Sequence, residues 1–150
     1  MKYKVKSSKL LNSFFWLGYS GSSFNYNKFV QLTGDYSGKT LPGTPANTLS
    51  AGIDMSLAFG LYLDINNYFC GRISMDDANT QYSVPYNLLG SRVGYRRKMR
   101  RYAFDIYAGA NNILNQKYSL GNDINASAGR YYNAAPLINY YAGISLSYLR

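Results

Sequence analysis

The stretch INYYAGISLSYLR, residues 138–150, decides the fold class of this chain. Apolar or aromatic residues occupy one set of alternate positions: Ile138, Tyr140, Ala142, Ile144, Leu146 and Tyr148. The positions between them hold mostly small or polar residues. A period of two is typical of a β-strand, because successive side chains of a strand point to opposite faces. The stretch therefore predicts a strand with one apolar face and one polar face.

Similar alternation recurs along the chain, at about 47–57, 61–74, 84–97, 101–117 and 137–149. The first 20 residues allow two interpretations: a signal peptide, with four lysines before the apolar stretch 10–18, or a hairpin. The hairpin has a strand at 2–8, a turn at 10–12 and a long strand at 13–30. Asn12 and Ser13 interrupt the apolar stretch, which favours the hairpin over the signal peptide. We therefore predict one all-β segment, residues 1–150, with an antiparallel, curved meander sheet of about six to eight long strands.

The connections between these segments alternate in length. The links near 10–12, 58–60 and 98–99 are short, whereas those at 31–46, 75–83 and 119–136 are long and rich in Gly, Asn, Asp and Pro. Short periplasmic turns and long extracellular loops are typical of outer-membrane β-barrels. We therefore expect a partial transmembrane β-barrel. A soluble β-sandwich alternates in the same way and remains the alternative.

The lengths of two turns agree with a single apolar face. Placing Leu57 and Leu61 on one face requires an odd loop, and Ala58-Phe59-Gly60 supplies three residues with glycine last. In the next hairpin, Tyr95 and Tyr102 share a face only if the loop is even, which predicts a turn at 98–99.

The composition favours strands and turns and excludes several kinds of chemistry. The chain has 17 tyrosines and 14 glycines but neither glutamate nor histidine. Histidine catalysis and histidine metal sites are therefore excluded, and the single Cys70 forms no internal disulfide. We expect no enzyme activity, no cofactor and no metal-binding residues.

The charge of the chain is strongly positive, with a formal net charge of +9. Its densest basic run contains Arg96, Arg97, Lys98, Arg100 and Arg101. Because this run lies between two alternating segments, we interpret it as a solvated hairpin turn. We do not expect nucleic acid as a partner, although a basic run invites that hypothesis.

The final strand also resembles an assembly signal. Tyr141, Gly143, Leu146 and Tyr148 follow the order of the C-terminal signal of outer-membrane proteins: a polar residue, a glycine, then spaced hydrophobic and aromatic residues. The resemblance implies recognition by the barrel-assembly machinery.

Longer motifs point to one family. The stretches DYSGKTLPGTPANTLSAGID, DDANTQYSVPYNLLGSRVGYRRK, YAGANNILNQKY and GNDINASAGRYYNAAP resemble the final strands and loops of TonB-dependent outer-membrane receptors. The strongest matches are Asn111, Asn112, Leu114, Gln116, Lys117 and Tyr118, and the run Gly129-Arg130-Tyr131-Tyr132. The likeness is greatest to receptors of the Bacteroidetes type, especially those for ferric citrate and other siderophores.

This resemblance implies a C-terminal barrel portion of a receptor that imports a ferric siderophore or a similar bulky nutrient. Such receptors have 22 strands and an N-terminal plug that contacts TonB, whereas this chain has room for six to eight strands and no plug. We therefore expect a fragment in the bacterial outer membrane that cannot transport alone. Its partners would be outer-membrane lipid and the rest of the receptor, including the plug. Alternatives are an autonomous eight-stranded barrel with a structural or adhesive role, and a soluble β-domain that binds a partner.

Candidate ligand-facing residues lie in two places. Asp76, Asp77, Asp123 and Arg130 lie in the long loops, where a substrate would first be met. Asp54 and Asp64 are predicted to oppose one another on the polar face. Because opposed like charges destabilise a sheet, we expect Arg72 or Arg92 to balance these solvated acids, with a bound cation as the alternative.

Overall fold

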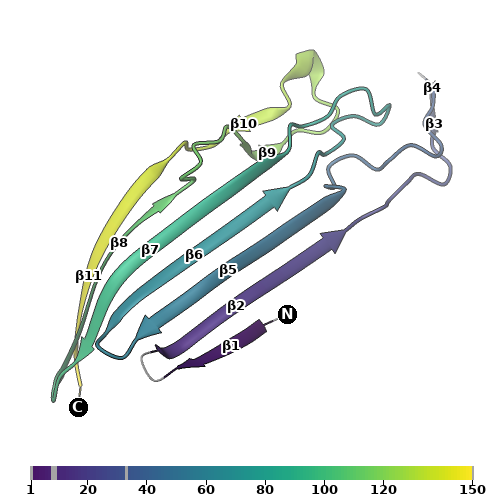
Figure 1. The fold of residues 1–150 in the computed structure, drawn as a ribbon. Coiled ribbons are helices and arrows are strands. Elements are labelled where there is room, and N and C mark those ends of the chain that lie inside the picture. The colour runs from purple at the N-terminus through teal and green to yellow at the C-terminus, as the bar shows by residue number, and fades with distance from the viewer. Residues whose placement is uncertain (1, 8–9, 33, 150) are drawn as a thin grey trace.

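The computed structural model describes residues 2–7, 10–32 and 34–149 of the chain. Its main element is a seven-stranded sheet, which contains β1 (Lys2–Ser7), β2 (Leu10–Gly21), β5 (Asn47–Leu57), β6 (Leu61–Cys70), β7 (Tyr86–Lys98), β8 (Tyr102–Asn111) and β11 (Asn139–Tyr148), in that order. All neighbouring strands are antiparallel. The predicted all-β, antiparallel meander is confirmed (Figure 1).

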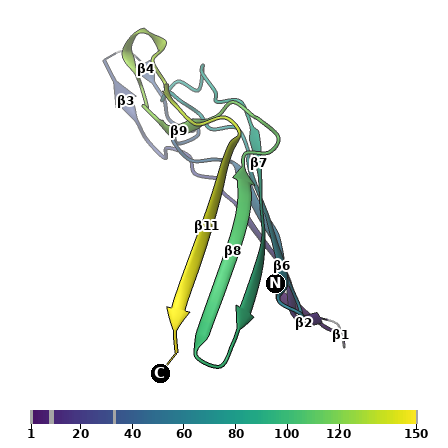
Figure 2. The same cartoon turned by 90° about the vertical axis from the view of Figure 1, so that its left-hand side faces the viewer.

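The sheet is a curved single layer, with turns at one end and long loops at the other (Figures 1 and 2). The long-loop rim contains β3 (Val30–Gln31), β4 (Gly34–Asp35), β9 (Ser119–Asn122), β10 (Tyr132–Ala134) and a short 3-10 helix, Ser127–Gly129. Among the described residues, β1 and β11 are the two edge strands and do not pair with each other. No helix in the described ranges is both long and apolar enough to cross a bilayer.

One face of the sheet is largely apolar from β2 to β11. The register places Ile106 opposite Tyr95 on one side and Ile144 on the other, so the apolar sets of β7, β8 and β11 coincide. Twelve large side chains of this apolar face are exposed: Phe15, Leu17, Tyr19, Ile53, Leu61, Val93, Tyr102, Ile106, Tyr140, Ile144, Leu146 and Tyr148. Ile144, for example, lies in the middle of β11, and its side chain is 79% exposed. Within the described residues, no second layer covers the apolar face.

The opposite, polar face is closely packed by aromatic rings that lie over glycines. Four direct cross-strand pairs have this form: Trp16 with Gly52, Tyr62 with Gly94, Tyr107 with Gly143, and Tyr141 with Gly109. A Cβ atom added to any of these glycines would lie between 2.3 and 2.5 Å from the ring of its partner. The glycines therefore leave the space in which large rings lie flat across the strands.

The buried core is small and lies at the long-loop rim. Cys70, Ile73 and Met75 form it, and Tyr86 and Tyr131 pack against it. Met75 is fully buried. The loops that follow β6 and β8 are therefore anchored to the end of the sheet by apolar contact.

The turn predicted at 58–60 is confirmed, and the turn predicted at 98–99 lies two residues further along the chain. Gly60 closes the β5–β6 turn with φ 109°, and an added Cβ there would lie 2.2 Å from the Arg96 carbonyl oxygen. In the next hairpin Lys98 still pairs with Ala103, so Arg100 and Arg101 form the tip. The apolar face is preserved because a shift of two residues keeps its parity.

Four predicted strand boundaries are wrong: both ends of the strand predicted at 13–30, and the ends of those predicted at 61–74 and 101–117. β6 ends at Cys70, not at 74. Leu10 already belongs to β2, so no turn occupies 10–12; residue 8 lies outside the described residues. β2 ends at Gly21, not near 30, because its partner β5 begins only at Asn47.

β8 ends at Asn111, not at 117, because the backbone turns at Asn112. Asn112 has φ 49°, and its side chain binds both the N–H and the carbonyl oxygen of Gln116. The Gln116 side chain in turn accepts the N–H of Asn87 at 2.9 Å. The Asn-Asn-x-Leu-x-Gln motif therefore ends one strand and ties the turn to the start of another.

Candidate functional site

Asp77 joins three loops at the long-loop rim. The Tyr26 hydroxyl donates to Asp77 Oδ1 at 2.6 Å, and Asn125 Nδ2 donates to Oδ2 at 2.8 Å. The Asp77 N–H donates back to Asn125 Oδ1 at 3.0 Å. These contacts tie the β2–β5, β6–β7 and β8–β11 connections together, so Asp77 holds the rim in one arrangement.

Asp76 stabilises the loop in which it lies, between β6 and β7, through hydrogen bonds to residues 80 and 81. Its Oδ1 accepts the N–H groups of Thr80 at 2.8 Å and Gln81 at 3.0 Å, and the Thr80 hydroxyl donates to Oδ2. Partial burial raises the pKa of the Asp76 carboxyl, but these hydrogen bonds outweigh it and lower the pKa below its usual value. Asp76 is therefore ionised at neutral pH and has fewer free lone pairs than a solvated carboxylate.

The two aspartates nevertheless border an open hollow of about 390 Å³, which is lined by Gln31, Tyr36, Asp76, Asp77, Ala78 and Asn125. Asp123 and Arg130 do not line it, and both are exposed. The Asp123 N–H donates to the Tyr131 carbonyl oxygen at 3.0 Å. The structure therefore brings together two of the four predicted loop residues.

A second hollow, of about 250 Å³, was not foreseen from the sequence. Its lining residues are Ser83, Val84, Tyr86, Lys117, Tyr118, Ser119, Asn122 and Tyr132. The rings of Tyr86 and Tyr118 lie 5.3 Å apart, and Asn122 Oδ1 is buried without a hydrogen-bond partner among the described residues. Aromatic walls, a cation and a free acceptor suit a ligand with a ring and hydroxyl groups. One feature of the sequence could have pointed to this hollow: Lys117 and Tyr118 belong to the receptor-like motif.

Asp54 and Asp64 lie directly opposite one another on the polar face, as the predicted register requires. Arg92, not Arg72, pairs with one member of the pair: its Nε and Nη2 donate to Asp64 Oδ2 at 2.9 and 2.6 Å. Arg72 instead lies over the Tyr82 ring at the loop rim, 4.8 Å from its centroid. No group of three or more metal-ligating side chains occurs in the described ranges.

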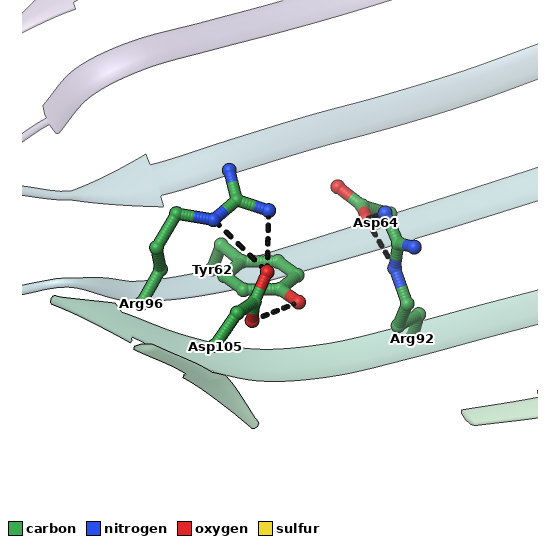
Figure 3. Close-up of polar contacts among 5 residues, drawn as sticks. All are labelled: Tyr62, Asp64, Arg92, Arg96 and Asp105. Atoms are coloured by element: carbon green, nitrogen blue, oxygen red, sulfur yellow. Dashed lines mark hydrogen bonds and ion pairs between the residues drawn. The ribbon is translucent and has the colours of Figure 1, made fainter. Parts of the chain in front are cut away.

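The polar face also contains a second ion pair. Arg96 donates to Asp105 Oδ2 at 2.7 Å, and the Tyr62 hydroxyl donates to Asp105 Oδ1 at 2.8 Å (Figure 3). The guanidinium groups of Arg92 and Arg96 lie 5.6 and 5.0 Å from the Tyr62 ring centroid. Because both ion pairs are partly exposed, each stabilises the sheet by about 0–1 kcal/mol. Their main effect is to hold Tyr62 across three strands.

The residues of the predicted assembly signal divide between the two faces. Tyr141 and Gly143 lie on the polar face, where the Tyr107 ring occupies the space above Gly143. Leu146 and Tyr148 lie on the apolar face and are 72% and 59% exposed. The Tyr148 ring meets the Tyr102 ring edge-on at 5.5 Å.

No protein-family model matches the chain.

Replacing Asp77 tests whether the loops form one unit. Asp77→Ala removes the acceptor of Tyr26 and Asn125, and hydrogen bonds to a charged group are worth about 1.5–3 kcal/mol. We expect amide hydrogen exchange in the three loops to accelerate about tenfold or more. Asp123→Ala is the matched control, because this exposed carboxylate has no side-chain partner among the described residues. Equal acceleration in both variants would contradict the linkage.

The same contact predicts a loss of loop order at high pH. The hydrogen bond to Asp77, together with burial and the charge of Asp77, raises the pKa of Tyr26 to about 12 from 10.0. The stabilisation is fully present below pH 10 and is lost as the pH rises through about 12, because the neutral phenol is the donor. Solvent screening reduces its size, since Tyr26 is only partly buried.

Proposed function

We propose that this chain is a C-terminal barrel portion of a TonB-dependent outer-membrane receptor that imports a ferric siderophore or a similar bulky nutrient. The observation behind the proposal is a single-layer antiparallel sheet with a broad, largely apolar face that carries many exposed large side chains. Domains of water-soluble proteins bury such a face against a second layer. Lipid would cover it without any further layer from this chain.

The polar face fits the interior of a large barrel. It places Asp54, Asp64, Arg92, Arg96 and Asp105 on the face that would be turned away from lipid. Charges on the lipid face of a barrel are costly, whereas a water-filled interior tolerates them. The charge distribution therefore supports lipid on one side of the sheet and water on the other.

The two open edges support a portion of a barrel over a small autonomous barrel. An unpaired strand edge in hydrocarbon costs several kcal/mol for each unsatisfied backbone group. Seven strands also conflict with the even number found in bacterial single-chain barrels. In the proposed receptor, strands from the rest of its barrel would pair with β1 and β11.

The receptor assignment, as opposed to another large barrel, rests on the motif resemblance and on the rim loops. The loops form an ordered layer with two hollows, where a bulky nutrient would first bind. We assign no residue to contact with iron. The plug, through which TonB acts in the family, would belong to the remainder of the receptor.

A chimeric receptor tests the proposal. Residues 1–150 replace the last strands of a ferric-citrate-type receptor, and the product is expressed in a strain that lacks its own receptor. We expect heat-modifiable mobility on a gel and TonB-dependent iron uptake. The 150-residue chain with a secretion signal is the control and should restore no uptake. Discrete single-channel conductance from that chain as a monomer would favour the autonomous barrel, and solubility without detergent would favour the soluble domain.

The assembly signal predicts unequal effects of two tyrosines on the apolar face of β11. Tyr148→Ala removes the ring contact with Tyr102, which is worth about 0.5–1.5 kcal/mol. We expect the inserted fraction of the chimera to fall about two- to tenfold. Tyr140→Ala is the control, because Tyr140 lies on the same face at the other end of the strand and is 76% exposed. Equal losses would contradict a signal centred on Tyr148.

A further inference from the structure

The turn between β7 and β8 bears an unbalanced cluster of cations. Arg97, Lys98, Arg100 and Arg101 are all exposed, and we call them the cationic turn. The neighbouring Arg96 is neutralised by Asp105 at 2.7 Å. Among the described residues the ion pairs are Arg92–Asp64 and Arg96–Asp105, so no carboxylate neutralises the cationic turn.

The cationic turn borders the apolar face. Arg97 pairs with Phe104 in the register of that face, and its Nη1 donates to the Tyr95 hydroxyl at 3.2 Å. The rings of Tyr95 and Phe104 lie 5.7 Å apart, and Tyr102 and Tyr148 make a second ring pair beside them. Tyrosine rings and the apolar stems of arginine both favour the boundary between hydrocarbon and water.

The opposite rim lacks such an excess of charge. It contains five cations, Lys28, Lys39, Arg72, Lys117 and Arg130, and four aspartates, Asp35, Asp76, Asp77 and Asp123. The cationic turn is therefore a local feature of the short-turn rim, and it lies at the far end of the sheet from the loops (Figure 1).

We propose that the cationic turn binds the phosphate groups of anionic phospholipids on the short-turn side of the membrane. The inference rests on the proposed function, which places the apolar face in lipid. Guanidinium groups match phosphate geometry, and three of the four cations are arginines. The cationic turn adjoins the ring pairs Tyr95–Phe104 and Tyr102–Tyr148 at the border of the apolar face. This position favours a lipid headgroup over free phosphate, because headgroups lie at the boundary between hydrocarbon and water.

Vesicle binding by the refolded full chain tests the inference. The vesicles are phosphatidylcholine alone, or phosphatidylcholine with a quarter of phosphatidylglycerol, at low and at high salt. The turn variant combines Arg97→Gln, Lys98→Gln, Arg100→Gln and Arg101→Gln. The control variant combines Lys28→Gln, Lys39→Gln, Lys117→Gln and Arg130→Gln, so both variants lose four positive charges.

We expect the original chain and the control variant to prefer the anionic vesicles about tenfold or more, since each cation near an anionic surface strengthens binding severalfold. The turn variant should lose this preference, and high salt should weaken it in the other two proteins. Equal losses in both variants, or no preference in the original chain, would overturn the inference. So would tighter binding of the cationic turn to a DNA duplex than to anionic vesicles.

The same experiment separates the inference from the proposed function. Retention on phosphatidylcholine vesicles after a urea wash measures burial of the apolar face in lipid, without anionic headgroups. Retention on both vesicle types without an anionic preference would reject the headgroup site alone. A chain that is washed from both vesicle types would reject the headgroup site; the chimeric receptor then tests the apolar face, because β1 and β11 have partner strands there.

Discussion

Ile106→Arg is expected to destabilise the membrane-inserted chain by about 2–4 kcal/mol, the cost of a cation near the middle of a lipid-facing barrel surface. Ile106 lies at the centre of β8, is 48% exposed and pairs with an apolar or aromatic residue on each side. Urea titration of the chimeric receptor refolded into vesicles gives the free energy of unfolding, since β1 and β11 have partner strands there. The outcome also discriminates between alternatives, because arginine on a water-exposed face would cost little.

Ser145→Arg is the appropriate control for this experiment. Ser145 is exposed on the polar face and lies directly opposite Asp105, so an arginine there meets water and a carboxylate. From the sequence alone, Asp105→Arg looks like an equivalent control. The structure excludes it, since Asp105 accepts hydrogen bonds from Arg96 and Tyr62. Similar losses for Ile106→Arg and Ser145→Arg would rule out lipid on the apolar face.

Gly94→Ala should cost about 1–3 kcal/mol, the usual range for overpacking. A Cβ atom at position 94 would lie 2.3 Å from the Tyr62 ring. That ring cannot move freely, because Tyr62 is 7% exposed and its hydroxyl donates a hydrogen bond to Asp105. The guanidinium groups of Arg92 and Arg96 also lie over the ring. The urea midpoint in detergent measures the loss.

Gly18→Ala provides the matched comparison. Gly18 lies in a strand of the same sheet, and an added Cβ there has no atom within 4 Å. Alanine at this position should be neutral or stabilising by up to about 1 kcal/mol, because it reduces the entropy of the unfolded chain. If Gly94→Ala is equally harmless, the Tyr62 ring is not held in the arrangement described.

Several features of the fold were predictable because a strand repeats every two residues. The period identified the apolar face of β11, and turn parity put the apolar residues of β5, β6, β7 and β8 on that same face, although the β7–β8 turn lies two residues from its predicted position. The opposition of Asp54 and Asp64 followed from the same register. Strand ends were less predictable. The end of β8, for example, depends on hydrogen bonds of Asn112 to Gln116, which no alternation signals.

The sequence by itself determined the antiparallel meander, its two unlike faces and the division into a turn rim and a loop rim, since these depend on local period and loop length. Only the tertiary structure decided what the candidate site residues do. Asp77 meets Tyr26 and Asn125 across about 50 residues of chain, and Arg92 rather than Arg72 balances Asp64. Irregular loops have no period from which such contacts could be derived. Their partners are set by the three-dimensional meeting of loop ends over the small core around Met75.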